Sequence, residues 1–268
     1  MQIDKAELAD CFTPSCALNY ILNQIDVLKP PVDIERIAKS LGIIEIIKLL
    51  TDSFEGCLVT DDYKQEGFII IRDNVSFGRK RFTIGHELGH FVLPRHSTKY
   101  LCKEESLGFV AKSSDMVALM ENEANEVAAG LLMPTHLYIE DMEKLGVPSL
   151  EGIRTLAYRY LVSFSAALHR FIALTQVPAT LVFSRDGRIL YTLKSNSFPF
   201  WLRSLSGGYL PDGSVSRSVR FQPGLRTEPK IVDPQIWLDN SLGRQFPDSI
   251  LEQTEQTISK FQITLLTV

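Results

Sequence analysis

The segment His86-Glu87-Leu88-Gly89-His90 limits what this chain can fold into more than any other stretch of its sequence. Two histidines four residues apart lie on the same face of an α-helix, with their Cβ atoms about 6 Å apart. From that face, two imidazole nitrogens can bind one Zn²⁺ ion at about 2.0–2.1 Å. The segment therefore predicts a helix near residues 82–93 that supplies two ligands to one zinc ion. The alternative is a surface helix with two incidental histidines.

Glu87 stands next to the first histidine, about 100° around the helix axis. From this position its carboxylate can hold a water molecule that zinc has made more acidic. The carboxylate can take the proton as the water attacks a carbonyl carbon, and then pass it to the leaving amine. We therefore predict Glu87 as the catalytic base of peptide-bond hydrolysis. Gly89 costs about 1 kcal/mol in a helix relative to alanine, which indicates close approach of another backbone or of substrate, or plain packing.

A catalytic zinc ion usually has three protein ligands and one open position, so a third ligand must come from elsewhere in the chain. His96 has the spacing of the third histidine in proteases with the pattern HExxHxxGxxH. That pattern needs a glycine at position 93, where the chain turns back to the metal. Here Leu93 precedes Pro94, and a residue before proline favours an extended backbone. The sequence therefore disfavours His96 as the third ligand.

Glu121 is the second candidate for the third ligand. If residues 116–132 form a helix, Glu121 lies inside the edge of the apolar face, whereas Glu123 projects near the opposite edge. A carboxylate on a packing face is costly unless something pairs with it, and zinc would do so. Asn125, one turn further on, could orient Glu121 through a hydrogen bond. A glutamate that extends from the helix edge to water explains the spacing equally well.

Two blocks of sequence resemble the ImmA/IrrE family of metallo-endopeptidases: RFTIGHELGH at residues 81–90 and ENEANEVAAGLLMP at residues 121–134. The family pattern is RFTxAHExxH, followed after a gap by ExxAN, a stretch of small residues and LLMP. The resemblance extends over residues 15–175. It departs from the pattern at Gly85, where alanine is usual, and at Val127, where phenylalanine is common. Neither departure changes a candidate ligand.

Carried over residue by residue, the resemblance implies His86, His90 and Glu121 as zinc ligands and Glu87 as the catalytic base. It implies Zn²⁺ as the cofactor and a protein as the substrate, namely a helix-turn-helix transcriptional repressor whose cleavage relieves repression. Two alternatives remain: a metal-dependent protein that sequesters a repressor without cleaving it, and a DNA-binding regulator. The intact Glu87 favours chemistry over binding alone.

Apolar periodicity and helix-breaking residues predict a mostly helical first half and a strand-rich end. The signal Arg185-Asp186-Gly187, flanked by β-prone runs, predicts a hairpin. We expect helices over residues 6–25, 33–42, 82–93, 115–132 and, as a pair, 149–174; we expect strands over residues 43–50, 67–72, 179–184, 188–193, 214–221 and 262–268.

These elements predict an α+β protein in three parts. Residues 1–148 form a mainly helical, zincin-like metallopeptidase domain with a small sheet. Residues 149–176 form a pair of helices that resembles a helix-turn-helix. Residues 177–268 form an α+β regulatory domain, similar in architecture to the GAF-like sensor domains of some family members. The helical pair offers mainly apolar side chains where a DNA-reading helix presents basic and amide groups, so we expect packing or substrate docking rather than direct DNA binding.

Charge and composition limit the partners and the compartment. The net charge of −4 disfavours general binding to polyanions, and Arg79-Lys80-Arg81 is expected in a solvated loop that could steer an acidic substrate. No apolar run approaches the roughly 20 residues that span a bilayer, and the first residues lack the pattern of a signal peptide. Four cysteines without CxxC spacing indicate reduced thiols. We therefore expect a cytoplasmic protein; the sequence does not define its oligomeric state.

Overall fold

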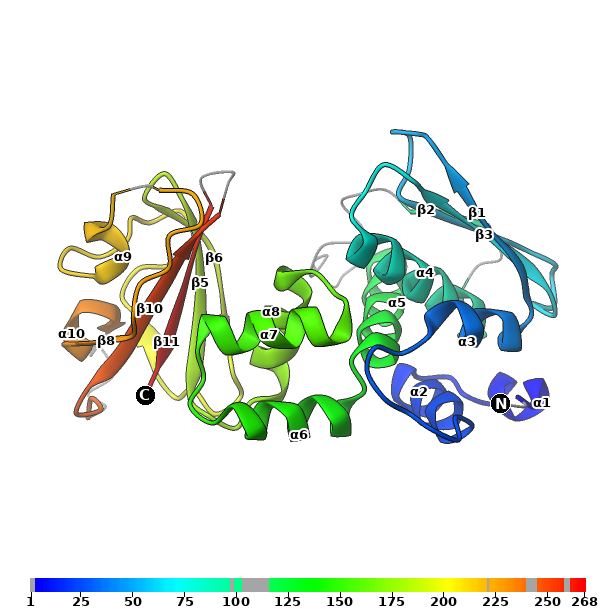
Figure 1. The fold of residues 1–268 in the computed structure, drawn as a ribbon, viewed down its shortest axis with the longest axis horizontal. Helices are drawn as coiled ribbons and strands as arrows, with labels where there is room; N and C mark the ends of the chain where they lie inside the picture. Colours follow the sequence, from blue (N-terminus) through cyan, green and yellow to red (C-terminus); the bar gives the residue numbers. More distant parts are fainter. Residues whose placement is uncertain (1–2, 97–98, 103–115, 221, 240–244, 258–260) are drawn as a thin grey trace. The chain divides into compact units, whose positions relative to one another are not determined.

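The computed structural model describes residues 3–96, 99–102, 116–220, 222–239, 245–257 and 261–268, and for residues 99–102 it describes the backbone. The chain divides into two compact units, Met1–Tyr138 with Ala157–Ser163, and Ile139–Leu156 with Phe164–Val268. Each unit contains helices and a sheet (Figure 1), so the predicted α+β class is confirmed. The predicted division into three parts stays a prediction.

Three helices open the first unit: α1 (Lys5–Ala9), α2 (Pro14–Asn23) and α3 (Ile34–Leu41). The single helix predicted over residues 6–25 is wrong, because the side chain of Thr13 caps a second helix that begins at Pro14. The prediction for the next helix is confirmed. Asp33 caps α3 by accepting a hydrogen bond from the Arg36 amide, and Gly42 ends it with a φ of 110°.

The turn between α1 and α2 also brings two cysteines together. Cys11 and Cys16 form a disulfide, with their Cα atoms 5.2 Å apart. The expectation of reduced thiols is therefore wrong for this pair. The sequence spacing did not predict it, because the pairing depends on how the segment between α1 and α2 folds.

The sheet of the first unit has the strand order β1-β3-β2-β4. Its strands are β1 (Ile43–Leu49), β2 (Gly56–Thr60), β3 (Gly67–Arg72) and β4 (Lys99–Cys102). β1 pairs with β3 in parallel, and the other pairs are antiparallel. The predictions of β1 and β3 are confirmed, and Ile69 and Ile71 on β3 are fully buried. The run that forms β2 is short and begins with glycine, and it was not predicted.

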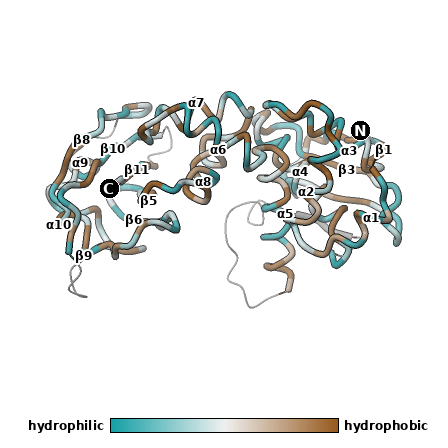
Figure 2. The backbone as a smooth tube through the Cα atoms, turned by 90° about the horizontal axis from the view of Figure 1, so that it is seen from below, coloured by the Kyte–Doolittle hydropathy of each residue, from teal (hydrophilic) through white to brown (hydrophobic). Residues whose placement is uncertain are grey.

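Two long helices, α4 (Phe77–Val92) and α5 (Met116–Leu132), lie side by side (Figure 1), and α4 also packs on β2 and β3. Ser76 caps α4, so the helix begins well before residue 82. A Cβ atom at Gly89 would lie 2.7 Å from the Cα atom of Ala124, and one at Gly85 would lie 3.1 Å from the Cα atom of Ala128. The glycines therefore allow the backbones of α4 and α5 to approach closely. Figure 2 shows hydrophobic segments along α2 and α5, which also pack together.

After α5 the chain forms α6 (Thr135–Leu145), α7 (Leu150–Tyr160) and α8 (Phe164–Leu174). The sheet of the second unit has the order β6-β5-β11-β10-β8 and is antiparallel. Its strands are β5 (Ala179–Arg185), β6 (Arg188–Lys194), β8 (Lys230–Val232), β10 (Ile250–Gln256) and β11 (Phe261–Thr267). Two short strands, β7 (Trp201–Leu202) and β9 (Leu238–Asp239), form a separate pair, and α9 (Val215–Ser218) and α10 (Pro234–Trp237) complete the unit.

The two faces of this second sheet have different covers. α8 packs on β5 and β6, where His169 stacks on Phe183 with ring centroids 5.6 Å apart. On the other face, Trp237 and Leu266 belong to a buried apolar cluster. The predicted hairpin is confirmed, since Asp186 and Gly187 both have positive φ angles. The strand predicted over residues 214–221 is wrong, because Ser214 caps α9 there.

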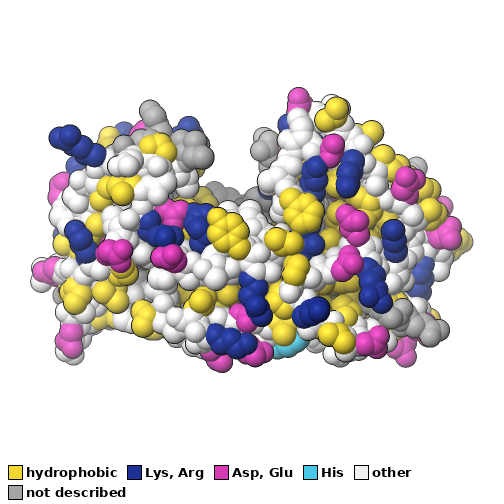
Figure 3. All heavy atoms as spheres, viewed as in Figure 1, with side chains coloured by type: hydrophobic (Ala, Val, Ile, Leu, Met, Phe, Trp, Pro, Cys, Tyr) yellow, Lys and Arg dark blue, Asp and Glu magenta, His cyan; other side chains and the backbone are white. Residues whose placement is uncertain are grey.

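No helix in the described part of the chain is both long and apolar enough to cross a membrane. On the face drawn in Figure 3, basic and acidic side chains are interspersed rather than gathered by sign. This distribution agrees with the modest net charge of the sequence.

Candidate metal centre

α4 and α5 together place three ligand-type side chains around one point. His86 and His90 lie one turn apart on α4, and both are fully buried. Their Nε2 atoms are 3.1 Å apart. Glu121, on α5, directs one carboxylate oxygen to each of them, at 3.4 Å in both cases. Each of these three side chains offers one ligand atom, and the three atoms lie within 4.8 Å of one another. Among the described residues, this set of side chains could hold a metal ion.

The charges of these groups suit a cation. Burial lowers the pKa of His90 to about 4, against the opposing effect of Glu121, so this imidazole is neutral at pH 7. Burial alone would raise the pKa of Glu121, but the neighbouring imidazoles of His86 and His90 outweigh it and bring that pKa to about 2. Neutral imidazole and ionised carboxylate are the forms of these side chains that bind metals.

Glu87 lies beside this group and is fully buried. Its position is tied to β2, since a Cβ atom at Gly56 would lie 2.3 Å from Glu87 Oε1 and 2.6 Å from Thr83 Cγ2. Only a residue without a side chain leaves room there for the carboxylate. The importance of Gly56 was missed at the level of sequence, because β2 was not predicted and nothing local marks this glycine.

Hydrogen bonds hold the two histidine rings from behind. His86 Nδ1 is 2.9 Å from the side-chain oxygen of Asn125, the residue predicted to orient Glu121. His96 is also buried, but it lies outside the three-residue group. Its Nδ1 atom is 2.9 Å from Nδ1 of His90, and its Nε2 atom is 3.0 Å from Glu123 Oε2. The structure therefore places His96 against a proposed ligand rather than among the ligands. The contact of Glu123 with it was not foreseen.

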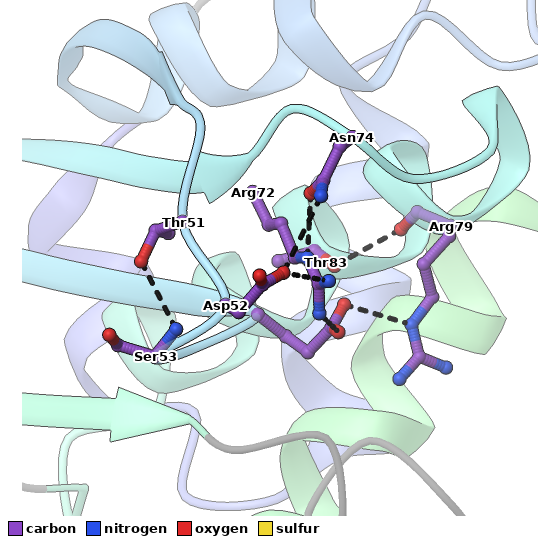
Figure 4. Close-up of polar contacts among 8 residues, drawn as sticks. Thr51, Asp52, Ser53, Arg72, Asn74, Arg79 and Thr83 are labelled. Carbon is purple, nitrogen blue, oxygen red and sulfur yellow. Dashed lines mark hydrogen bonds and ion pairs between the residues drawn. The ribbon is translucent and has the colours of Figure 1, made fainter.

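The basic run before the histidines forms part of α4 and is not a solvated loop. Arg79 Nε is 3.4 Å from Glu55 Oε2, and Arg72 reaches the other oxygen of that carboxylate at 3.2 Å. Figure 4 shows Arg72 and Arg79 in this network, together with the hydrogen bond from Thr83 Oγ1 to the Arg79 carbonyl. The network fixes the start of β2 immediately before Gly56.

The other two cations of the run are engaged as well. Lys80 is 2.5 Å from Asp73, and Arg81 is buried and donates to the Val32 carbonyl at 2.7 Å. The expectation that this run is solvated is therefore wrong, because its charges serve contacts within the first unit.

Comparison with known proteins agrees with this geometry. Residues 43–171 match the family model of peptidase M78, described as an IrrE N-terminal-like domain. The radiation response metalloprotease IrrE of Deinococcus radiodurans is 28% identical over 127 residues, which cover 46% of this chain and 36% of that protein. Residues 43–171, just under half of this chain, are therefore similar to the metallopeptidase domain of the ImmA/IrrE family. The matched region spans little more than a third of the length of that relative.

A structural comparison extends beyond the domain. A Mycobacterium tuberculosis transcriptional regulator has a similar fold, with a TM-score of 0.60 and 15% identity over 95% of this chain and 76% of that one. At this identity the likeness concerns the fold alone.

Proposed function

We propose that this chain is a zinc-dependent endopeptidase that cleaves a transcriptional repressor. The observation that carries the proposal is the triangle formed by the side chains of His86, His90 and Glu121. The two Nε2 atoms are 3.1 Å apart, and each lies 3.4 Å from a different carboxylate oxygen of Glu121. A tetrahedral zinc ion with bonds of about 2.0–2.1 Å holds any two of its ligand atoms about 3.3 Å apart. The side chains therefore fit zinc in both donor type and spacing.

The roles follow from the positions of the side chains. His86, His90 and Glu121 would hold the zinc ion, which when bound acidifies water and polarises a carbonyl group. Glu87 would accept the proton of the attacking water and deliver it to the amine that leaves. The buried position of Glu87 keeps bulk water from competing for this proton. Asn125 would hold the ring of His86 through the contact at Nδ1.

The identity of the substrate rests on weaker support. The family domain supports a protein substrate, and the family resemblance in the sequence supports a helix-turn-helix repressor. The helical pair does not favour DNA as an alternative, since Ala167, Leu168 and Phe171 of α8 are buried and the helix packs on β5 and β6. We propose that residues 177–268 regulate the peptidase, as a GAF-like sensor domain would, in a cytoplasmic protein.

The test compares wild type with Glu87→Gln and with the control Glu126→Gln, which changes an exposed glutamate on α5. Each purified protein is analysed for zinc and then incubated with a lysate of its source cells, in which new protein N-termini are identified by mass spectrometry. We expect all three proteins to hold zinc. Wild type and the control should generate the same new N-termini, and Glu87→Gln should generate none, because an amide cannot take the proton.

Two outcomes would contradict the proposal. Unchanged cleavage by Glu87→Gln would place the chemistry elsewhere. Zinc-loaded wild type that cleaves no protein, but retains a repressor on an affinity column, would favour sequestration without cleavage.

A further inference from the structure

His96 lies behind the proposed metal site, on the side of His90 that faces away from Glu121. His90 directs Nε2 to the carboxylate of Glu121 and Nδ1 to His96. His96 in turn directs its second nitrogen to Glu123, and its side chain is fully buried. The three side chains Glu123, His96 and His90 therefore form one continuous hydrogen-bonded chain that ends at the metal site.

Both ends of this chain are anchored. At one end, Arg95 donates a hydrogen bond to Glu123 Oε1 at 2.9 Å, which holds the carboxylate toward His96. At the other end, Lys64 Nζ donates to the carbonyl oxygens of His90 and Leu93, at 2.7 Å each. These two bonds fix the last turn of α4 and the bend that follows it. The residues of the chain are thus held in position by groups on either side.

The position of each hydrogen in the chain follows from the carboxylate. An ionised carboxylate only accepts hydrogen bonds, so His96 Nε2 must carry the hydrogen that it donates to Glu123. A neutral imidazole has one N–H, so His96 Nδ1 must then be an acceptor. The hydrogen between the two Nδ1 atoms consequently belongs to His90. With its hydrogen on Nδ1, His90 directs the lone pair of Nε2 toward His86 and Glu121.

We propose that Glu123 and His96 are positioning residues that set the tautomer of His90 and hold its ring for the metal ion. This inference rests on the proposed function, because it assigns a role toward the metal of that site. His86 has the corresponding support from one residue, Asn125, through its own Nδ1 atom. The two histidines would thus be oriented by separate partners, and the support of His90 extends over two side chains.

The test measures the affinity of the metal-free full-length protein for Co²⁺ by competition with a chelator, together with the visible spectrum of the bound Co²⁺. Partners of this kind contribute about 10–100-fold to metal affinity, so we expect Glu123→Ala and His96→Phe each to weaken Co²⁺ binding by about that factor. Both should also change the Co²⁺ spectrum. Glu123→Gln should remain close to wild type, because its side-chain oxygen can still accept the His96 hydrogen bond. The control Glu126→Ala, on the same helix, should have no effect.

A double variant tests whether the two residues act in series. Glu123→Ala combined with His96→Phe should bind Co²⁺ about as weakly as either single variant, since each one already interrupts the chain. Additive losses would overturn the proposal, and so would Co²⁺ binding equal to wild type in both single variants. His96→Phe, which keeps a ring of similar size, decides the question where circular dichroism shows that Glu123→Ala does not fold.

The outcomes separate this inference from the proposed function. Wild type that binds Co²⁺ but cleaves no protein contradicts the peptidase and leaves the positioning role supported by the variants. Equal Co²⁺ affinity in all variants overturns the positioning role and leaves the peptidase intact.

Discussion

Glu121 in the first unit and Glu252 in the second unit are both buried carboxylates, but different kinds of group surround them. Glu252 on β10 is fully buried and accepts three hydrogen bonds. The donors are the amides of Val215 and Ser216, at 3.1 and 2.8 Å, and the indole nitrogen of Trp237, at 2.9 Å. Glu121 instead faces two imidazole nitrogens, each at 3.4 Å.

The difference lies in what the surrounding nitrogens can do. Amide and indole nitrogens are always donors, so they stabilise the charge of Glu252 without any additional ion. An imidazole nitrogen can instead present a lone pair, and a carboxylate beside two lone pairs requires a cation. Burial alone therefore does not identify a metal site. The first carboxylate belongs to the candidate metal site and the second to the framework of the fold.

The largest expected effect concerns the imidazoles. The double variant His86→Ala/His90→Ala should fall from about one zinc ion per chain to below about 0.1, because a single carboxylate binds zinc poorly. Cleavage should be lost with the metal. Elemental analysis of the purified protein measures the loss, and His136→Ala, at an exposed histidine, is the control. Full zinc occupancy in the double variant would contradict this difference between the two carboxylates, since Glu121 would then need no imidazole.

The second prediction addresses the other carboxylate. Glu252→Ala leaves three buried N–H groups without their acceptor and should lower the free energy of unfolding by about 3–5 kcal/mol. Both tryptophans of the chain, Trp201 and Trp237, lie in the second unit, so tryptophan fluorescence during urea unfolding reports on this unit. Zinc content should not change. A loss below about 1 kcal/mol, or no greater than that of the exposed control Glu228→Ala, would contradict the role of Glu252.

The sequence predicted features that depend on neighbouring residues better than features that depend on contacts between distant segments. Short-range patterns carried the information for α3, for the hairpin at Asp186 and for the helix that bears His86 and His90. Helical periodicity placed Glu121 on the apolar face of α5, which made it a candidate for the third metal ligand. Contacts between distant segments could not be predicted in this way.

Three contacts illustrate this limit. Gly56 leaves room for Glu87 only because β2 lies against α4. Glu123 reaches His96 only because a bend follows α4. Glu252 shows no local pattern, because its donors are contributed by α9 and α10. In each case the constraint arises from packing between elements, and a single sequence does not record which elements meet.

A buried histidine of the second unit allows a comparison of stability at different pH values. Burial lowers the pKa of His169 in the second unit to about 4, below the ordinary value of about 6.5. Protonation therefore favours the unfolded state, and the stability that this residue contributes is present above pH 6.5 and lost as pH falls toward 4. Between these values the second unit should lose about 2–3 kcal/mol more in wild type than in His169→Phe. Urea unfolding followed by tryptophan fluorescence measures this difference; parallel pH profiles of the two proteins would contradict it.

The smallest expected effect tests the spacing between α4 and α5, on which the metal triangle depends. A Cβ atom in Gly89→Ala would lie 2.7 Å from Ala124 Cα, so the helices must separate. Overpacking costs about 1–3 kcal/mol and the gain in helix propensity returns about 1 kcal/mol, which leaves a net loss of about 1 kcal/mol. Separation should also move Glu121 away from the imidazoles, so Co²⁺ affinity should fall as well. Gly152→Ala in α7 is the matched control, because the nearest atoms to its Cβ atom would be in the side chains of Ser149, at 3.2 Å, and Leu145, at 3.4 Å. A Gly89→Ala protein that is more stable than wild type and binds Co²⁺ equally well would show that the glycine does not set the distance between ligands.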